Sequence, residues 1–197
     1  MTLPLVLASG SRYRAALLKQ LQLEFSQASP DIDETPLREE TAEDYVNRLA
    51  AEKARALSTV YPSHWIIGSD QTCLLDGKIT GKPGTSEKAL EQLRSVQGRR
   101  VTFLTGLCLY NSQTGAQYQM VEPFHVHFRT LTDEELRHYI NIEQPLDCAG
   151  SFKVEGLGIN LFSALEGRDA NSLIGLPLIG LCDLMRQAGL NPLLLAR

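Results

Sequence analysis

The sequence predicts an α/β fold, in which a mixed, twisted sheet is flanked by helices. Strand and helix patterns alternate along much of the chain, and two long β-rich stretches meet at a glycine turn. With 197 residues the chain can form one substantial domain, or one domain with two lobes around a cleft. We treat residues 1–197 as one domain and expect residues from roughly 100 to 142 to form the second lobe.

The N-terminal half alternates strictly between the two kinds of element. Thr41 is the predicted N-cap of the second helix, with Asp44 three residues further on. An apolar run ending at Asp70 predicts a buried strand that continues to Leu75. The expected strands cover residues 3–8, 24–28 and 64–75, and the expected helices cover residues 12–21, 42–58 and 86–96.

The C-terminal half is expected to begin with a long hairpin. The β-rich stretches cover residues 100–111 and 117–129 and flank Gly115. Thr132 and Glu135 then predict a capping box for a helix that reaches about Ile142. A glycine-rich segment, a short strand and a final helix over residues 176–188 complete the chain.

Bulk composition excludes several classes of function. The formal net charge of −4 and the lack of a basic stripe argue against a binder of nucleic-acid polymers, whereas a small anionic substrate needs only a few cations. No apolar run approaches the roughly 20 residues that span a bilayer, and the N-terminus lacks the features of a signal peptide. The scattered cysteines argue against zinc and disulfides, so we expect a cytosolic, cytoplasmic protein with reduced cysteines: Cys73, Cys108, Cys148 and Cys182.

Two cations interrupt the apolar stripes of the first two helices. Arg14 lies in the stripe of the first helix and Lys53 in that of the second, so each either snorkels to solvent or faces a cleft. The turn Ser9-Gly10-Ser11 precedes the first helix, whose free N–H groups and dipole suit a phosphate, although one serine could simply cap the helix. A shared anion explains two inward-facing cations better than coincidence does.

Three further residues are candidates from their positions. Asp70 comes directly after the apolar run 65–69, and a carboxylate there can act as general base, hold a metal ion or cap a turn. Glu34 lies in an acidic loop that is either solvated or a source of oxygen ligands for magnesium. Lys82 lies between Gly81 and Pro83, and the sequence alone predicts a solvated lysine there.

Taken together, these positions resemble the Maf family of nucleotide pyrophosphatases. The resemblance implies a two-lobed α/β fold with a central cleft, as in Maf and ITPase-like proteins. It also implies a divalent cation, magnesium or manganese, and hydrolysis of a nucleoside triphosphate to monophosphate and diphosphate. The matching segments follow the family's order: LASGSRYRAALL (7–18), DIDETP (31–36), residues 51–54, IIGSDQ (66–71), ITGKP (79–83), residues 102–106, CAGSFKVEG (148–156) and IGLPL (174–178).

The resemblance also assigns expected roles to individual residues. Asp70 matches the family's proton acceptor, and Glu34 matches an acidic position associated with metal or water, so both are the expected metal ligands. The positions that match the family's phosphate contacts are Ser9, Ser11, Arg14, Lys53 and Lys82. The resemblance further suggests a homodimer; the nucleotide is the expected partner, with no nucleic-acid polymer and no membrane.

Three positions that separate subfamilies point to the base. Tyr13, Gln71 and Glu155 resemble the subfamily that acts on 7-methyl-GTP, whose usual aromatic is tryptophan rather than tyrosine. A methylated guanine is cationic, stacks on an aromatic ring, and suits a carboxylate that accepts its N1–H and 2-amino hydrogens. The alternatives are hydrolysis of dTTP, UTP or other modified nucleotides, and a regulatory nucleotide-binding protein linked to cell-division arrest.

Overall fold

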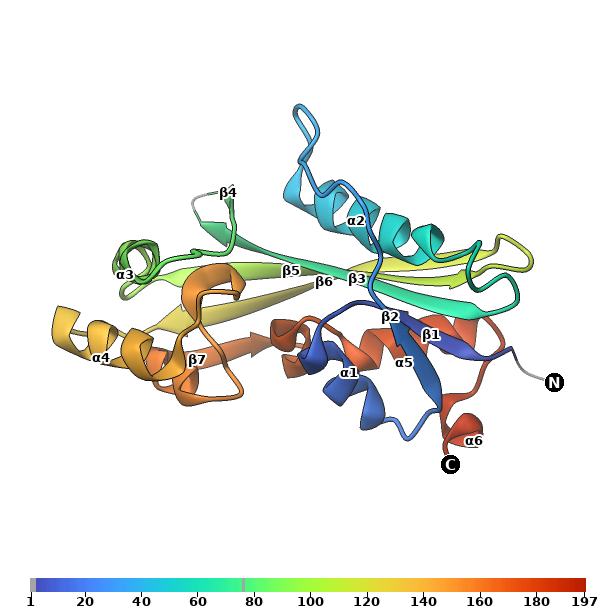
Figure 1. Ribbon diagram of the computed structural model, residues 1–197. Coiled ribbons are helices and arrows are strands. Elements are labelled where there is room, and N and C mark those ends of the chain that lie inside the picture. The colour runs from blue at the N-terminus through green and yellow to red at the C-terminus, as the bar shows by residue number, and fades with distance from the viewer. Residues whose placement is uncertain (1–2, 76) are drawn as a thin grey trace.

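A mixed sheet forms the centre of the molecule in a computed structural model that describes residues 3–75 and 77–197. Within these residues the sheet has seven strands, in the order β2-β1-β3-β5-β6-β7, and β4 pairs with β3 beside this path (Figure 1). The strands are β1 (Leu5–Ala8), β2 (Phe25–Ala28), β3 (Trp65–Leu75), β4 (Lys78–Thr80), β5 (Arg100–Asn111), β6 (Gln117–Phe128) and β7 (Phe162–Gly167). The predicted α/β class with a mixed sheet and flanking helices is confirmed.

Helices cover both faces of this sheet. In Figure 1, α2 lies on one face of the sheet, and α1 and α5 lie on the other. The helices α3 and α4 lie towards the end of the sheet that is far from both termini. The α-helices are α1 (Arg12–Lys19), α2 (Ala42–Ala56), α3 (Ser86–Ser95), α4 (Asp133–Glu143), α5 (Leu178–Gln187) and α6 (Pro192–Leu195). Of three short 3-10 helices, η1 (Ala149–Ser151) and η2 (Leu157–Leu161) overlap the segment predicted as glycine-rich, and η3 (Ala170–Ile174) follows β7.

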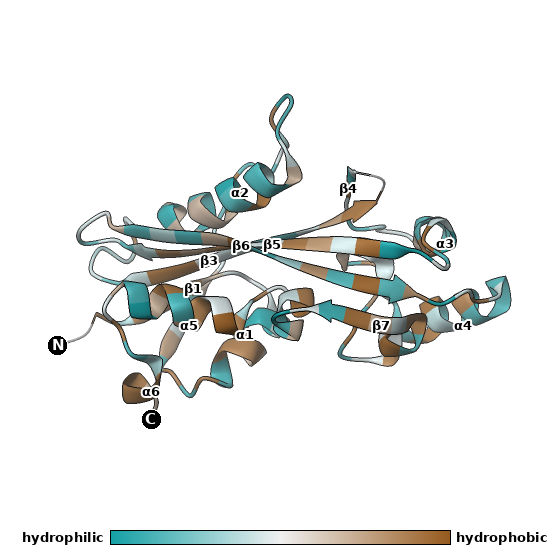
Figure 2. Ribbon diagram, turned by 180° about the vertical axis from the view of Figure 1, so that it is seen from behind, coloured by the Kyte–Doolittle hydropathy of each residue, from teal (hydrophilic) through white to brown (hydrophobic). Residues whose placement is uncertain are grey.

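The apolar core is divided by the sheet. β1 is hydrophobic along its length (Figure 2), and alternate residues point to opposite faces. Leu5 and Leu7 pack in the cluster with α1 and α5, whereas Val6 and Ala8 pack in the cluster with α2. A third cluster, rich in phenylalanine, joins α3 and α4 to the far end of the sheet. Both faces of β1 are therefore buried, which explains its uninterrupted apolar sequence.

Most predicted element boundaries are close to the observed ones. Thr41 Oγ1 accepts a hydrogen bond from the backbone N–H of Asp44 at 3.1 Å, and Thr132 and Glu135 form both bonds of a capping box. The helix predicted as the final one is α5, which begins at Leu178 rather than at residue 176 and is followed by the short helix α6. The residue before Pro177 is disfavoured in the helical conformation, so the helix begins only after this proline. The division into two lobes remains a prediction.

The direction of pairing changes at β3. β1 pairs with β2 and β3 in parallel, whereas β3, β5, β6 and β7 pair antiparallel. Ala8, the last residue of β1, lies opposite Gly68 in β3. The chain that leaves β1 therefore lies beside the middle of β3, two residues before Asp70. Polar residues that follow β1 meet polar residues of β3 at this edge, as is typical of ligand sites in α/β sheets.

Candidate active site

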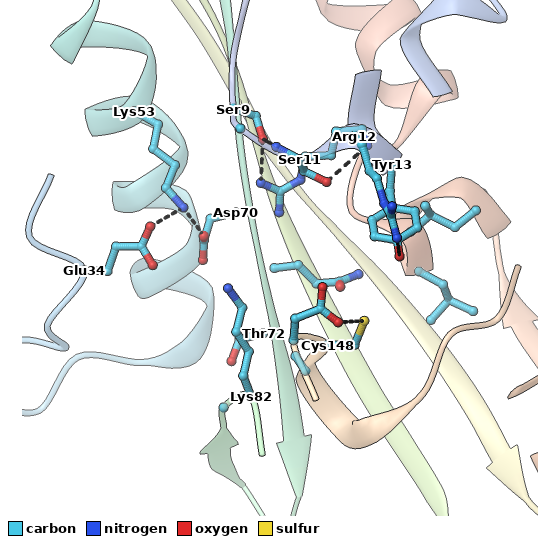
Figure 3. A pocket seen from close by; sticks show the side chains of 18 of the residues that line it. Ser9, Ser11, Arg12, Tyr13, Glu34, Lys53, Asp70, Thr72, Lys82 and Cys148 are labelled. Atoms are coloured by element: carbon cyan, nitrogen blue, oxygen red, sulfur yellow. Dashed lines mark hydrogen bonds and ion pairs between the residues drawn. The ribbon is translucent and has the colours of Figure 1, made fainter. Parts of the chain in front are cut away.

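A cleft of about 690 Å³ lies where β1 ends against β3. The start of α1, the inner face of α2, the acidic loop, the loop after β4 and the chain around η1 surround it. Figure 3 shows side chains from these segments pointing toward one another. The structure brings every candidate site residue to this cleft: Ser9, Ser11, Tyr13, Arg14, Glu34, Lys53, Asp70, Gln71, Lys82 and Glu155.

The turn after β1 presents unpaired backbone donors. Ser11 is the N-cap of α1, and its Oγ accepts from the N–H of Arg14 at 3.3 Å, while Ser9 Oγ accepts from the N–H of Ser11 at 3.2 Å. Within residues 3–75 and 77–197, the N–H groups of Gly10 and Arg12 have no hydrogen-bond partner. Free N–H groups at the start of a helix are a ready site for an anion.

Gln27, on the edge strand β2, orients this turn, although no local pattern in the sequence singles it out. Its Nε2 donates to the carbonyl oxygens of Ser9, at 2.7 Å, and Ser11, at 3.2 Å. In a trans peptide the N–H points opposite to the C=O. Holding these carbonyls therefore directs the N–H groups of Gly10 and Arg12 away from Gln27.

Arg14 faces the cleft rather than snorkelling to bulk solvent. Its Nε donates to the carbonyl oxygen of Gly175 at 2.8 Å, and its Nη1 lies 3.5 Å from Ser9 Oγ. Desolvation lowers the pKa of Arg14, while the negative charges of Asp70 and Glu34 oppose that shift. The guanidinium is thus held beside the turn, with its remaining N–H groups available to an anion.

Lys53 joins two carboxylates across the cleft. Its Nζ lies 2.6 Å from Asp70 Oδ1 and 2.7 Å from Glu34 Oε1 (Figure 3). Lys53 and Asp70 are each only 7% exposed, whereas the Glu34 side chain is 54% exposed. Partial burial raises the pKa of Glu34, but the hydrogen bond and charge of Lys53 outweigh it, so this pKa lies below its usual value. The nearest anions to Lys53 are therefore the protein's own carboxylates.

Two residues of α2 hold the acidic loop in place, and neither was singled out from the sequence. Tyr45 Oη donates to the carbonyl oxygen of Glu34 at 3.0 Å. Arg48 donates to the carbonyl oxygen of Thr35 at 3.3 Å and pairs with Glu40 at 2.6 Å. These contacts fix the backbone at Glu34 and just after it, although the Glu34 side chain is half in solvent.

Close packing of α2 on the sheet sets the distance of Lys53 from β3. A Cβ atom added at Gly68 would lie 2.0 Å from the carbonyl oxygen of Ala50, and one at Gly106 would lie 2.0 Å from that of Val46. Both obstacles are backbone atoms of α2, which cannot turn aside as a flexible side chain can. Only glycine at these positions lets the helix lie this close to β3 and β5.

Replacing Gly106 by alanine is expected to lower the free energy of unfolding by about 1–3 kcal/mol, because the helix must move away from the sheet. Denaturant unfolding followed by circular dichroism measures this loss. Gly81→Ala is the matched control, since a Cβ atom there meets open space. Equal stability of the two variants would contradict the close-packing explanation.

The three residues expected to contact the base, Tyr13, Gln71 and Glu155, also line the cleft. The guanidinium carbon of Arg12 lies 4.9 Å from the ring centroid of Tyr13, and Arg12 Nη2 donates to Tyr13 Oη at 2.9 Å. Gln71 lies half-buried against η3, and Glu155 is exposed at the rim. One face of the Tyr13 ring therefore already has a cationic neighbour, Arg12, which no sequence pattern indicated.

An α/β fold whose cleft combines unpaired N–H donors at a helix start with a buried lysine–carboxylate cluster is suited to an anionic ligand. The chain matches the model of the Maf family, described as "Maf-like protein", over residues 4–188, and it belongs to this family. Membership implies a nucleotide pyrophosphatase.

One solved structure similar to this chain is described as that of the Staphylococcus aureus Ham1 protein. The similarity covers 64% of this chain and 71% of that chain, with 16% sequence identity and a TM-score of 0.45. Among the helices of the described residues, none combines the length and apolar character that crossing a membrane requires.

Proposed function

We propose that this protein hydrolyses a nucleoside triphosphate to a monophosphate and diphosphate, with 7-methyl-GTP as the preferred substrate. One observation carries the proposal: a single cleft contains the unpaired donors of the first turn on one side and the Lys53–Asp70–Glu34 cluster on the other. The first can bind phosphates, and the second can activate water. Within the family this combination favours catalysis over regulatory binding alone.

Phosphate binding is assigned to donors that already converge. Arg14, the N–H groups of Gly10 and Arg12, and the hydroxyls of Ser9 and Ser11 surround one side of the cleft. Lys82, exposed on the loop after β4, would reach the phosphates from the other side. Most of the rate enhancement in phosphoryl transfer comes from such positioning and charge neutralisation.

Asp70 is the proposed general base. Its Oδ1 is held by Lys53 at 2.6 Å, and in the part of the chain that the structure describes its Oδ2 has no hydrogen-bond partner. Oδ2 would take a proton from the water that attacks the α-phosphorus, and diphosphate would leave. Lys53 fixes the orientation of the carboxylate during this step.

A divalent cation fits beside the same carboxylates. Asp70 and Glu34 already converge on one positive charge, the Lys53 ammonium. Magnesium in nucleotide sites is typically held by one or two carboxylates, with phosphates and water completing its ligands. No cluster of three or more His, Cys, Asp or Glu suited to a metal occurs among the described residues, so the protein would supply Asp70 and Glu34 only. The ion would neutralise phosphate charge.

The choice of 7-methyl-GTP is supported by charge at the base end of the cleft. Glu155 and Asp147 both line the rim, and both are acidic. A cationic base is attracted by these carboxylates and can stack on Tyr13, although Arg12 competes for that ring. The expectations of a homodimer and of a cytosolic protein remain predictions.

A substrate panel with diphosphate detection tests the proposal. We expect 7-methyl-GTP to give the highest kcat/KM among 7-methyl-GTP, GTP, dTTP and UTP, and activity to require added magnesium or manganese. Preference for dTTP would overturn the assignment of the base but keep the chemistry. Tight nucleotide binding without release of diphosphate would instead favour a regulatory binding protein.

Replacing Glu155 by glutamine is expected to lower the ratio of kcat/KM for 7-methyl-GTP over GTP about fivefold. The two substrates share the triphosphate, so their ratio isolates the charge of the base, and two unit charges 4 Å apart in water interact by about 1 kcal/mol. Glu166→Gln, which removes an exposed carboxylate outside the cleft, is the matched control. An unchanged ratio in Glu155→Gln would contradict the charge argument.

A further inference from the structure

Successive side chains of β3 point to opposite faces of the sheet. Asp70 points toward α2, where Lys53 binds it. Its neighbours point the other way: Ser69 Oγ donates to the carbonyl oxygen of Gly175 at 2.8 Å, and Gln71 Nε2 donates to that of Ser172 at 2.5 Å. The proposed base and the residue expected to contact the nucleobase are therefore supported by different parts of the protein, α2 and the η3 segment.

Gln71 lies directly opposite Thr105 in the antiparallel pair of β3 and β5. Thr105 is completely buried, and its Oγ1 lies 3.0 Å from the carbonyl oxygen of Ser172 and 3.3 Å from Gln71 Nε2. A carbonyl oxygen only accepts, so the single hydroxyl hydrogen of Thr105 is donated to Ser172. Thr105 Oγ1 must then accept from Gln71.

The orientation of the Gln71 amide follows from these two neighbours. Both atoms that it faces, Ser172 O and Thr105 Oγ1, act as acceptors toward it, so its NH₂ group must occupy this side. The NH₂ group is thereby directed at these two acceptors. The remaining polar atom, Oε1, has no hydrogen-bond partner within the described residues, and the side chain lines the cleft.

The acceptor position of Ser172 is itself fixed. Ser172 is fully buried, and its Oγ donates to the carbonyl oxygen of Asp169 at 2.6 Å. Asp169, which is 3% exposed, accepts from the N–H groups of Asn171, at 2.9 Å, and Ile179, at 2.7 Å. Hydrogen bonds within the η3 segment and to the start of α5 thus fix this segment, so it can hold Gln71 in one orientation.

We propose that Thr105 is a positioning residue that makes Gln71 an acceptor toward the nucleobase and prevents it from acting as a donor. Glu155 then accepts from the N1–H and one hydrogen of the 2-amino group, and Gln71 Oε1 accepts from the other hydrogen of that amino group, so this acceptor pair selects guanine or 7-methylguanine. The assignment rests on the proposed function, because it requires a nucleobase at this end of the cleft. It adds a buried residue to the determinants of base specificity.

The test compares GTP with ITP, whose base lacks only the 2-amino group. We expect the wild-type protein to prefer GTP, and Thr105→Val, which replaces the hydroxyl by a methyl group, to lower that preference about fivefold, the typical effect of one neutral hydrogen bond. The change should appear in KM, with kcat for GTP nearly unchanged. Thr105→Ser keeps the hydroxyl and should retain the wild-type preference.

Thr102→Val is the matched control on the same strand. Thr102 also forms a hydrogen bond through its hydroxyl, to His125 Nδ1 at 3.0 Å, but neither residue lines the cleft. This variant should leave the preference unchanged. Equal losses of kcat/KM for GTP and for ITP in Thr105→Val would overturn the proposal, because they would show a general structural effect. An unchanged preference in Thr105→Val would overturn it as well.

A second variant covers the case in which Thr105→Val does not fold. Gln71→Met has similar length but no acceptor, so it should lose the preference for GTP; retention of the preference would overturn the proposal. If both variants fold, adding Thr105→Val to Gln71→Met should cause no further loss of the preference for GTP, since Thr105 acts through Gln71.

If the wild-type protein releases no diphosphate, the proposed function fails. Calorimetric comparison of GMP binding with IMP binding then still tests the acceptor pair.

Discussion

Replacing Asp70 by asparagine is expected to reduce hydrolysis about a thousandfold while nucleotide binding is largely retained. Asparagine preserves the shape of the side chain but cannot take a proton from water, and loss of a general base typically costs between a hundredfold and ten-thousandfold. Glu34 still pairs with Lys53 at 2.7 Å, so the ammonium keeps one partner. Diphosphate release and calorimetric titration with nucleotide measure the two effects separately.

Asp133→Asn provides the control for this experiment. Asp133 pairs with Arg94 on the surface and does not line the cleft, so its replacement should leave turnover unchanged. If Asp70→Asn turned over substrate at the wild-type rate, Asp70 would not be the general base. If binding disappeared together with turnover, Asp70 would instead act chiefly in holding the nucleotide or its metal ion.

Replacing Lys53 by methionine is expected to destabilise the fold by about 3–5 kcal/mol, the typical cost of removing one partner of a buried ion pair. Asp70 is only 7% exposed and would lose the cation at 2.6 Å from its Oδ1. Methionine retains much of the aliphatic length, so the loss reflects charge more than packing. Denaturant unfolding at neutral pH measures the change.

The same variant tests whether the two carboxylates can hold a divalent cation. Without the ammonium, Asp70 and Glu34 should bind magnesium more tightly, so millimolar magnesium should raise the melting temperature of Lys53→Met more than that of the wild-type protein. Lys88→Met, at an exposed position on α3, should show neither the instability nor the metal response. A wild-type melting temperature without metal would contradict the assigned importance of the ion pair.

Local signals in the sequence predicted the main elements and the cations of the cleft. Thr41 and Thr132 mark helix starts through their own side chains, and Arg14 and Lys53 are conspicuous because charges interrupt apolar stripes. Asp70 was recognisable from its place after an apolar run. Each of these signals depends on residues only a few positions apart, which is why one sequence suffices to detect them.

The supporting contacts of the cleft could not be predicted in the same way. Thr105 acts on Gln71 only because β3 and β5 pair in one particular register, and both meet the carbonyl of Ser172 far along the chain. Gln27 reaches the first turn only because β2 is the parallel neighbour of β1. No local pattern encodes such contacts, since they arise from the tertiary arrangement of segments that look ordinary in isolation.

The glycines under α2 have a consequence for comparing this protein with its relatives. Gly68 and Gly106 do not line the cleft, yet their missing methyl groups let α2 lie close enough for the Lys53 ammonium to reach the carboxylate of Asp70. A survey restricted to cleft-lining side chains would pass over both. In a homologue with alanine at either site, α2 would lie further from the sheet, and the counterparts of Lys53 and Asp70 would be further apart. Its sequence would still match the catalytic residues, although the geometry of the site would differ.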